Sequence, residues 1–103
     1  MLLIPEHFSD LEGFDWDHGN DVKNWKRHQV TQAEAEQVFL NRPVLVTETM
    51  KAGLDELRYA ALGVCNSGKA LMIVFTIRDN KIRVISARAM SKKERQVYAQ
   101  VEN

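Results

Sequence analysis

Four side chains stand at alternating positions around a predicted turn, where three of them could bind a phosphate backbone. The runs "ALMIVFTIR" and "KIRVISAR" are separated only by "DN", a spacing typical of a two-residue hairpin turn. This turn pairs Arg78 with Lys81 and Thr76 with Arg83, and alternation along the strands puts all four on one face. Because guanidinium groups meet phosphate oxygens in pairs, these cations could bind a nucleic acid. The alternative is that they only keep an exposed sheet face soluble.

The same register predicts which side chains face the core. It pairs Val74 with Ile85 on the basic face and puts Arg88 on the core side, where we expect it to pair with a carboxylate such as Glu94. Met72, Val74 and Ile85 are candidates for an apolar patch on the basic face. The predicted core side of the hairpin consists of Leu71, Ile73, Phe75, Ile77, Ile82 and Val84.

His28 is the second candidate for chemistry, because it follows Arg27 in "KRHQ" at the end of a predicted short helix. Histidine side chains can act as general acid or base at neutral pH. The alternative is a structural role at the helix end. Spacing alone leaves both open.

Other kinds of site are not indicated. The sequence has no Gly-rich phosphate loop, nucleophile elbow or paired-histidine motif. His7 and His18 lack metal-ligand spacing with each other, with His28 or with Cys65, which closes an apolar strand and is expected to be a buried small hydrophobe. We therefore expect neither a metal ion nor a cofactor.

The periodicity of apolar residues predicts the elements that position these side chains. We expect strands at 14–16, 44–49, 57–65, 70–77 and 81–88, and helices at 17–28, at 32–40 and after Ser91. Thr31 with Glu34, and Ser91 with Glu94, are capping boxes that begin the last two helices. Their buried faces are predicted to be Ala35, Val38 and Phe39, and Val97, Tyr98 and Val101. The prediction is an α+β domain over 14–103, an antiparallel sheet with helices packed on one face, after a loosely attached leader at 1–13.

Composition and charge limit the class of protein. The chain has 103 residues, 45% of them hydrophobic, which suits one soluble domain. The apolar run Ala70–Ile77 is too short for a membrane span. A single cysteine and the absence of a signal-peptide pattern predict a cytoplasmic protein. The net charge is zero, but residues 1–60 carry an excess of acids and residues 61–103 an excess of bases. This asymmetry suits a polyanion on one side or a partner that matches one half, but the two halves of one domain can also face each other.

Several segments together resemble the BrnT family of toxins. They are "FDWD", then Asn24, Arg27 and His28, "AEQVF", "DELRYAALG", "GKALMIVFTIR" and "IRVISARAMSKKERQVY". The resemblance covers about residues 14–98, and its second half is the more specific. It implies a fold similar to that of RelE-type ribonuclease toxins. It also implies a complex with a BrnA-like antitoxin that carries a DNA-binding domain.

The resemblance further implies an endoribonuclease that acts on mRNA without a metal ion. Carried over by position, it implies catalytic roles for His28, Arg58 and Arg78. It implies RNA-binding roles for Arg27 and Arg83, and the hairpin register adds Lys81 to this set. Such chemistry needs a base for the 2′-hydroxyl, an acid for the leaving oxygen and positive charge on the phosphorane.

The chain departs from the family pattern at three positions. Asn20 stands where a lysine is usual, Gln29 where a glycine usually follows the histidine, and Gln32 where an aromatic residue usually packs. These departures leave two further functions open. One is a catalytically inactive partner of the antitoxin that acts in transcriptional autoregulation. The other is a free-standing nucleic-acid-binding module, against which the zero net charge argues.

Overall fold

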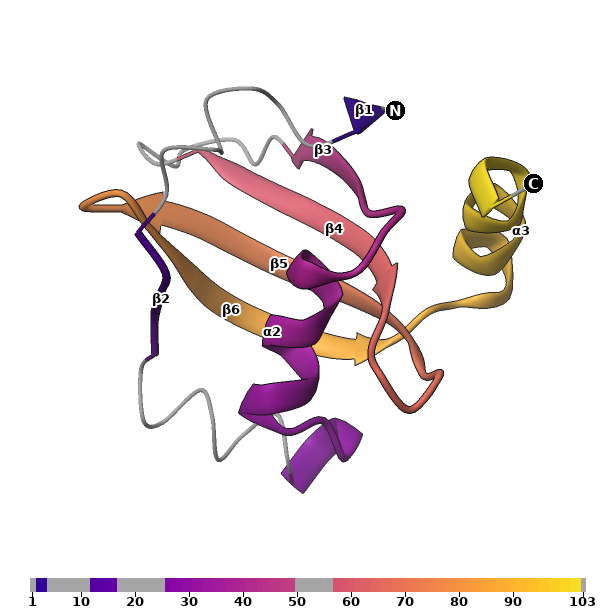
Figure 1. Ribbon diagram of the computed structural model, residues 1–103, viewed down its shortest axis with the longest axis horizontal. Coiled ribbons are helices and arrows are strands. Elements are labelled where there is room, and N and C mark those ends of the chain that lie inside the picture. The colour runs from indigo at the N-terminus through magenta and orange to yellow at the C-terminus, as the bar shows by residue number, and fades with distance from the viewer. Residues whose placement is uncertain (1, 4–11, 17–25, 50–56, 103) are drawn as a thin grey trace.

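A computed structural model describes residues 2–3, 12–16, 26–49 and 57–102. Its sheet has six strands in the order β1-β3-β4-β5-β6-β2. Figure 1 shows helix α2 crossing the sheet and helix α3 standing apart, near the end of β6. In chain order the elements are β1 (Leu2–Leu3), β2 (Phe14–Asp15), α2 (Gln32–Leu40), β3 (Leu45–Thr49), β4 (Arg58–Val64), β5 (Ala70–Arg78), β6 (Lys81–Ala89) and α3 (Lys92–Glu102). Residues 26–28 are also helical, whereas the rest of the helix predicted at 17–28 lies outside the described residues.

The predicted hairpin of β5 and β6 is confirmed at its turn. Arg78 pairs with Lys81 and Thr76 with Arg83. Asp79 and Asn80 both have positive φ, at 52° and 62°, as a primed two-residue turn requires. The four residues of the predicted basic face therefore share one face of the sheet.

A β-bulge corrects the register farther from the turn. Phe75 pairs with Val84 but Val74 pairs with Ser86, so Ile85 has no counterpart and the predicted pairing of Val74 with Ile85 is wrong. One extra residue shifts every later β6 side chain to the opposite face. Arg88 therefore pairs with Met72, and its side chain lies on the face of the sheet opposite to the predicted core side.

Helix α2 begins and ends where the sequence predicted. The Thr31 side chain accepts from the Glu34 backbone and the Glu34 carboxylate accepts from the Thr31 backbone, which completes the capping box. The helix ends at Asn41, whose backbone N–H donates to Gln37 O. Its buried side chains, Ala35, Val38 and Phe39, pack on one face of the sheet against Val44, Val46, Tyr59, Ala61, Leu71, Ile73, Phe75 and Val84.

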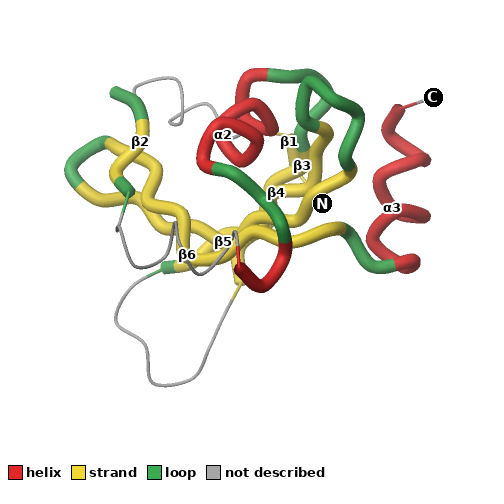
Figure 2. Tube along the Cα trace, turned by 90° about the horizontal axis from the view of Figure 1, so that it is seen from below, coloured by secondary structure: helices red, strands yellow, loops and turns green. Residues whose placement is uncertain are grey.

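Helix α3 packs against the opposite face, so the prediction of helices on one face is wrong. Tyr98 of α3 is buried with Leu45, Leu62 and Met72, whose side chains alternate with those under α2. Its hydroxyl donates to the Pro43 carbonyl oxygen at 2.6 Å. Figure 2 shows α2 over the sheet and α3 beyond its end. Val101 was predicted to be buried, but 39% of it is exposed.

The sheet is mixed and not purely antiparallel, because β2 runs parallel to β6. The segment predicted as a loose leader also contributes to the sheet. Its β1 pairs with β3, and the residue pair at 12–13 hydrogen-bonds to the β5–β6 hairpin. Among the described residues, no helix combines the length and apolar character that a membrane span needs.

Candidate functional site

Four of the predicted site residues lie together at the turn end of the hairpin. We call them the hairpin-end group: Arg58, Arg78, Lys81 and Arg83. Arg58 begins β4, and the pairing of Tyr59 with Phe75 places Arg58 opposite Thr76. Because Thr76 in turn pairs with Arg83, these side chains form one row across three neighbouring strands.

The row continues onto the edge strand. Asp15 of β2 pairs with Arg83, and its Oδ2 lies 3.9 Å from Nη1 of that arginine. The aspartate side chain is 48% exposed, so this ion pair is weakened by water. Glu12 N donates to Asn80 O, and Ile82 N donates to Gly13 O, which holds the start of this strand against the hairpin.

Burial differs sharply along the row. Thr76 was predicted to lie on an exposed face, but it is 2% exposed and its hydroxyl donates to the Leu57 carbonyl oxygen at 2.8 Å. Arg58 is half-buried, and its Nε atom is buried with no hydrogen-bond partner among the described residues. A buried donor without a partner is costly. Arg78 and Lys81 are exposed at the turn.

The apolar patch predicted on this face is only partly available. Met72 is 9% exposed and packs with Tyr98 and Met90, so α3 covers it. Val74 is half-buried beside the same cluster. The bulge residue Ile85 is also half-buried.

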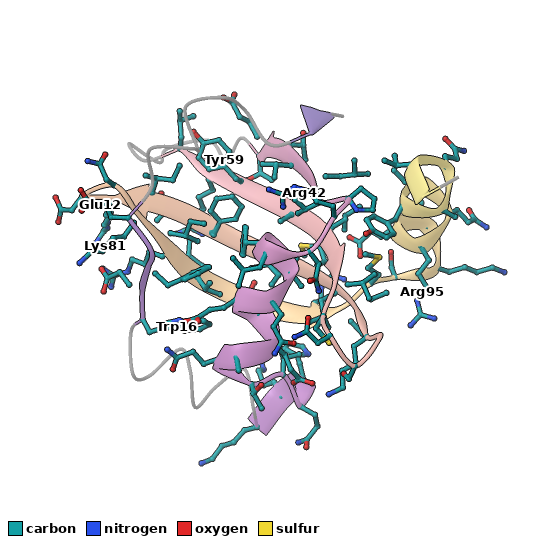
Figure 3. All side chains as sticks on the ribbon, viewed as in Figure 1. Glu12, Trp16, Arg42, Tyr59, Lys81 and Arg95 are labelled. Atoms are coloured by element: carbon teal, nitrogen blue, oxygen red, sulfur yellow. The ribbon has the colours of Figure 1, made fainter. Side chains whose placement is uncertain are left out.

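Arg27 and His28 lie elsewhere, at the opposite end of β5. His28 lines an open cleft with Ala70 and Leu71, at the start of that strand, whereas Arg78 ends it. Leu71 and Arg78 are seven residue steps apart along the strand, which is about 23 Å at about 3.3 Å per step. In Figure 3, Lys81 and Arg95 mark the two ends. His28 is therefore not brought together with the hairpin-end group.

The cleft around His28, which we call the His28 cleft, gathers cationic side chains from separate parts of the chain. It has a volume of about 370 Å³. Its described lining residues are His28, Gln29, Val30, Gly68, Lys69, Ala70, Leu71, Ala89 and Arg95. That lining contains no carboxylate, so its charged groups are cationic.

Lys69 ties the two sides of the His28 cleft together. Its Nζ donates to the Gln29 carbonyl oxygen at 3.3 Å and lies 2.8 Å from Oε2 of Glu34. The hydrogen bond from Lys69, followed by the one from the Thr31 backbone, lowers the pKa of Glu34 below its ordinary value. The capping box of α2 and the β4–β5 turn are thus joined by one carboxylate.

The predicted partner of Arg88 is confirmed. Its guanidinium donates to both carboxylate oxygens of Glu94, at 2.8 and 3.0 Å. Glu94 also accepts from the Ser91 backbone at 2.8 Å, which completes the second predicted capping box with the bond from Glu94 N to the Ser91 hydroxyl. The side chains of Arg88 and Glu94 thus join β6 to the first turn of α3.

Sequence reasoning missed Asp15 beside the hairpin-end group, and Lys69 and Arg95 in the His28 cleft. The alternation of apolar residues in "FDWD" indicated a strand at Asp15. It did not indicate that this strand pairs with β6 and brings Asp15 next to Arg83. Lys69 stood in a loop, "NSGK", and Arg95 in the first turn of a helix, where both read as ordinary surface residues. Among the described residues, no group of three His, Cys, Asp or Glu side chains could hold a metal ion.

Comparison with known proteins identifies a family and a solved structure of similar fold. The family model described as "Ribonuclease toxin, BrnT, of type II toxin-antitoxin system" matches residues 16–94. Among solved structures, the chain is similar to the Brucella abortus ribonuclease toxin BrnT, with 23% sequence identity and a TM-score of 0.58, over 78% of this chain and 97% of that chain. At this identity the structural match indicates a shared fold alone. No curated protein sequence matches the chain.

Proposed function

Because the chain belongs to the BrnT family of ribonuclease toxins of type II toxin-antitoxin systems, we propose that it is an endoribonuclease that cleaves mRNA. The observation that carries this proposal is the row of Arg58, Thr76 and Arg83 across three strands, with the buried Nε of Arg58 lacking a partner among the described residues. The outer nitrogens of a guanidinium in this row can donate to phosphodiester oxygens in pairs. Arg78 and Lys81, next to the row, supply further positive charge.

The proposed reaction is attack by the RNA's own 2′-hydroxyl. The 2′-oxygen forms a bond to phosphorus, the bond from phosphorus to the 5′-oxygen breaks, and the leaving 5′-oxygen takes a proton from water. The products are a 2′,3′-cyclic phosphate and a 5′-hydroxyl. Arg58 and Arg78 stabilise the charge that develops on the phosphorane. Lys81 and Arg83 bind flanking phosphates. Asp15, aligned with Arg83, is the carboxylate placed to accept the 2′-hydroxyl proton.

His28 has a different place in this proposal from the one that the family resemblance implied. His28 lies beside the start of β5, about 23 Å along the strand from Arg78, so we do not assign it to the phosphate that the hairpin-end group holds. We assign Arg27 and His28 to contacts with another part of the RNA. Substituting His28 should then weaken RNA binding and leave the rate at saturating RNA largely unchanged.

An antitoxin is implied by the family, and we propose one that carries a DNA-binding domain, of the BrnA type, in a hetero-oligomer with this chain. We also propose that the fold is related to that of the RelE-type toxins. The charge of residues 61–103 supports a partner that covers the basic side of the molecule. Charge reversal at Arg83 should therefore weaken the antitoxin complex.

One observation favours a second candidate function, the catalytically inactive partner that acts in transcriptional autoregulation. The separation of His28 from Arg58 and Arg78 removes the imidazole from the cationic row. In this case the chain would bind its antitoxin and RNA but would not cleave.

Growth of a host strain after induction of this chain alone distinguishes the two functions. We expect arrest by the unaltered chain, and loss of arrest in Arg58→Ala and Arg78→Ala at matched protein levels. Lys93→Ala is the matched control, because it removes one exposed cation from α3, outside both groups. Normal growth with folded, unaltered chain would support the inactive partner instead.

A further inference from the structure

We propose that the His28 cleft is a nucleotide-binding subsite for RNA, separate from the hairpin-end group. The inference rests on the proposed function and adds to it a second place where the same substrate is held. Three charged or titratable side chains meet there: His28 before α2, Lys69 after the β4–β5 turn and Arg95 in the first turns of α3. All three can donate hydrogen bonds to phosphate oxygens.

The size and lining of the cleft fit a nucleotide. Its volume of about 370 Å³ lies within the range of small-molecule sites, which is about 300–1,000 Å³. Gly68 adds space, because a Cβ built on it would meet nothing within 4 Å. The described lining residues include no carboxylate. The charge of Lys69 is already paired with Glu34, so Arg95 and His28 would be the main groups that meet an anion.

One wall of the cleft is fixed before any ligand binds. Lys69 is held between Glu34 and the Gln29 carbonyl oxygen, so its position requires little ordering on binding. Half of the lysine side chain, 48%, remains exposed. Arg95 on the opposite wall is exposed, so it can reach a ligand that enters the cleft from solvent.

The lining favours RNA over a segment of a partner protein. Protein partners gain most of their affinity from apolar or aromatic anchors in the centre of an interface. The large apolar residues of the cleft, Val30 and Leu71, are only 2% and 1% exposed, so they offer no such anchor. Large apolar side chains with high exposure, Leu40 and Leu57, are not among the lining residues.

Nuclear magnetic resonance titration with adenosine 3′-monophosphate tests this subsite directly. We expect the backbone amides of Gln29, Gly68 and Ala70 to shift, with inorganic phosphate producing a smaller shift of the same amides. Arg95→Ala should weaken binding of the mononucleotide by about tenfold, and it should reduce the salt dependence of binding to a non-cleavable RNA by about one phosphate contact. Lys93→Ala, on the same helix but outside the cleft, should bind as the unaltered chain does.

Two results would overturn the subsite. One is the absence of shifts at those amides at millimolar mononucleotide, and the other is an unchanged affinity in Arg95→Ala. An acidic peptide that shifts the same amides at lower concentrations than the mononucleotide would assign the cleft to a protein partner. RNA cleavage that depends on Arg58 would survive each of these results. Conversely, mononucleotide binding without cleavage would leave the subsite standing and remove the proposed enzyme.

Discussion

Arg88 donates to both carboxylate oxygens of Glu94, from Nη1 at 2.8 Å and from Nη2 at 3.0 Å. The same carboxylate accepts from Ser91 N and so caps α3. One side chain therefore fixes the helix to the strand that leads into it. This joint positions Arg95 on the wall of the His28 cleft, one residue after Glu94.

Removing this carboxylate should loosen the joint. Glu94→Ala loses a bidentate ion pair and a helix cap together, so we expect the free energy of unfolding to fall by about 1–3 kcal/mol. Both side chains are partly exposed, which argues for the lower part of that range. Urea denaturation measures the change, with Gln96→Ala, an exposed change in α3, as the control. Equal midpoints for the two variants would show that the joint contributes nothing.

The free energy of unfolding should decrease at acidic pH, because two carboxylates that stabilise the fold become protonated. The hydrogen bond from Lys69 lowers the pKa of Glu34, and the one from Arg88 lowers the pKa of Glu94. Since each folded pKa lies below the ordinary value of 4.5, the stabilisation is fully present above that pH and is lost as pH falls through the folded pKa values. Urea midpoints measured between about pH 7 and pH 3 should decline less in Glu34→Gln/Glu94→Gln than in the unaltered chain. Parallel declines would contradict this origin.

Gln29 occupies a backbone conformation that favours glycine, with φ at 57°. Glycine usually follows the histidine in the family pattern, so the backbone keeps the glycine conformation with a different side chain. Gln29→Gly should change the free energy of unfolding by less than about 1 kcal/mol, because relief of strain offsets the added freedom of the unfolded chain. A β-branched side chain tolerates this conformation poorly, so Gln29→Val should lose about 1–3 kcal/mol. Thermal denaturation of the two variants side by side would reveal equal losses if the conformation carried no strain.

Gly63 lets α2 approach β4 closely. A Cβ at this position would lie 2.7 Å from Cγ1 of Val38, a contact too short to tolerate without movement. Gly63→Ala should therefore destabilise the chain by about 1–3 kcal/mol. In the double variant Gly63→Ala/Val38→Ala the loss should be smaller than the sum of the single losses, because the clashing methyl group is gone. Additive losses would mean that the clash is relieved elsewhere.

The local features of the fold could be predicted from the sequence. The two capping boxes and the two-residue turn each depend on residues at most three positions apart, and all three form as expected. The α+β class followed from the order of these elements. The partner of Arg88 was also predictable, because Glu94 is only six residues away, in the first turn of the helix that follows β6.

Features that depend on contacts between distant segments could not be predicted. The bulge at Ile85 lies in the run "RVIS", where apolar residues occupy both faces and nothing marks an extra residue. The prediction that both helices share a face failed for the same reason, because β5 is apolar on both sides and fits a helix on either. The family pattern grouped His28 with Arg58 and Arg78, but it carries no distances, and β5 holds the two groups at its opposite ends.

Cleavage of an mRNA by the purified chain tests the central claim, that the hairpin-end group is where the RNA strand is cut. The rate at saturating RNA should fall by about a hundredfold or more in Arg58→Ala. His28→Ala should weaken RNA binding with little change in that rate, and Lys93→Ala should match the unaltered chain in both. The cleaved strand should end in a 2′,3′-cyclic phosphate. A saturating rate that is abolished by His28→Ala and retained by Arg58→Ala would contradict the account and place the chemistry in the His28 cleft.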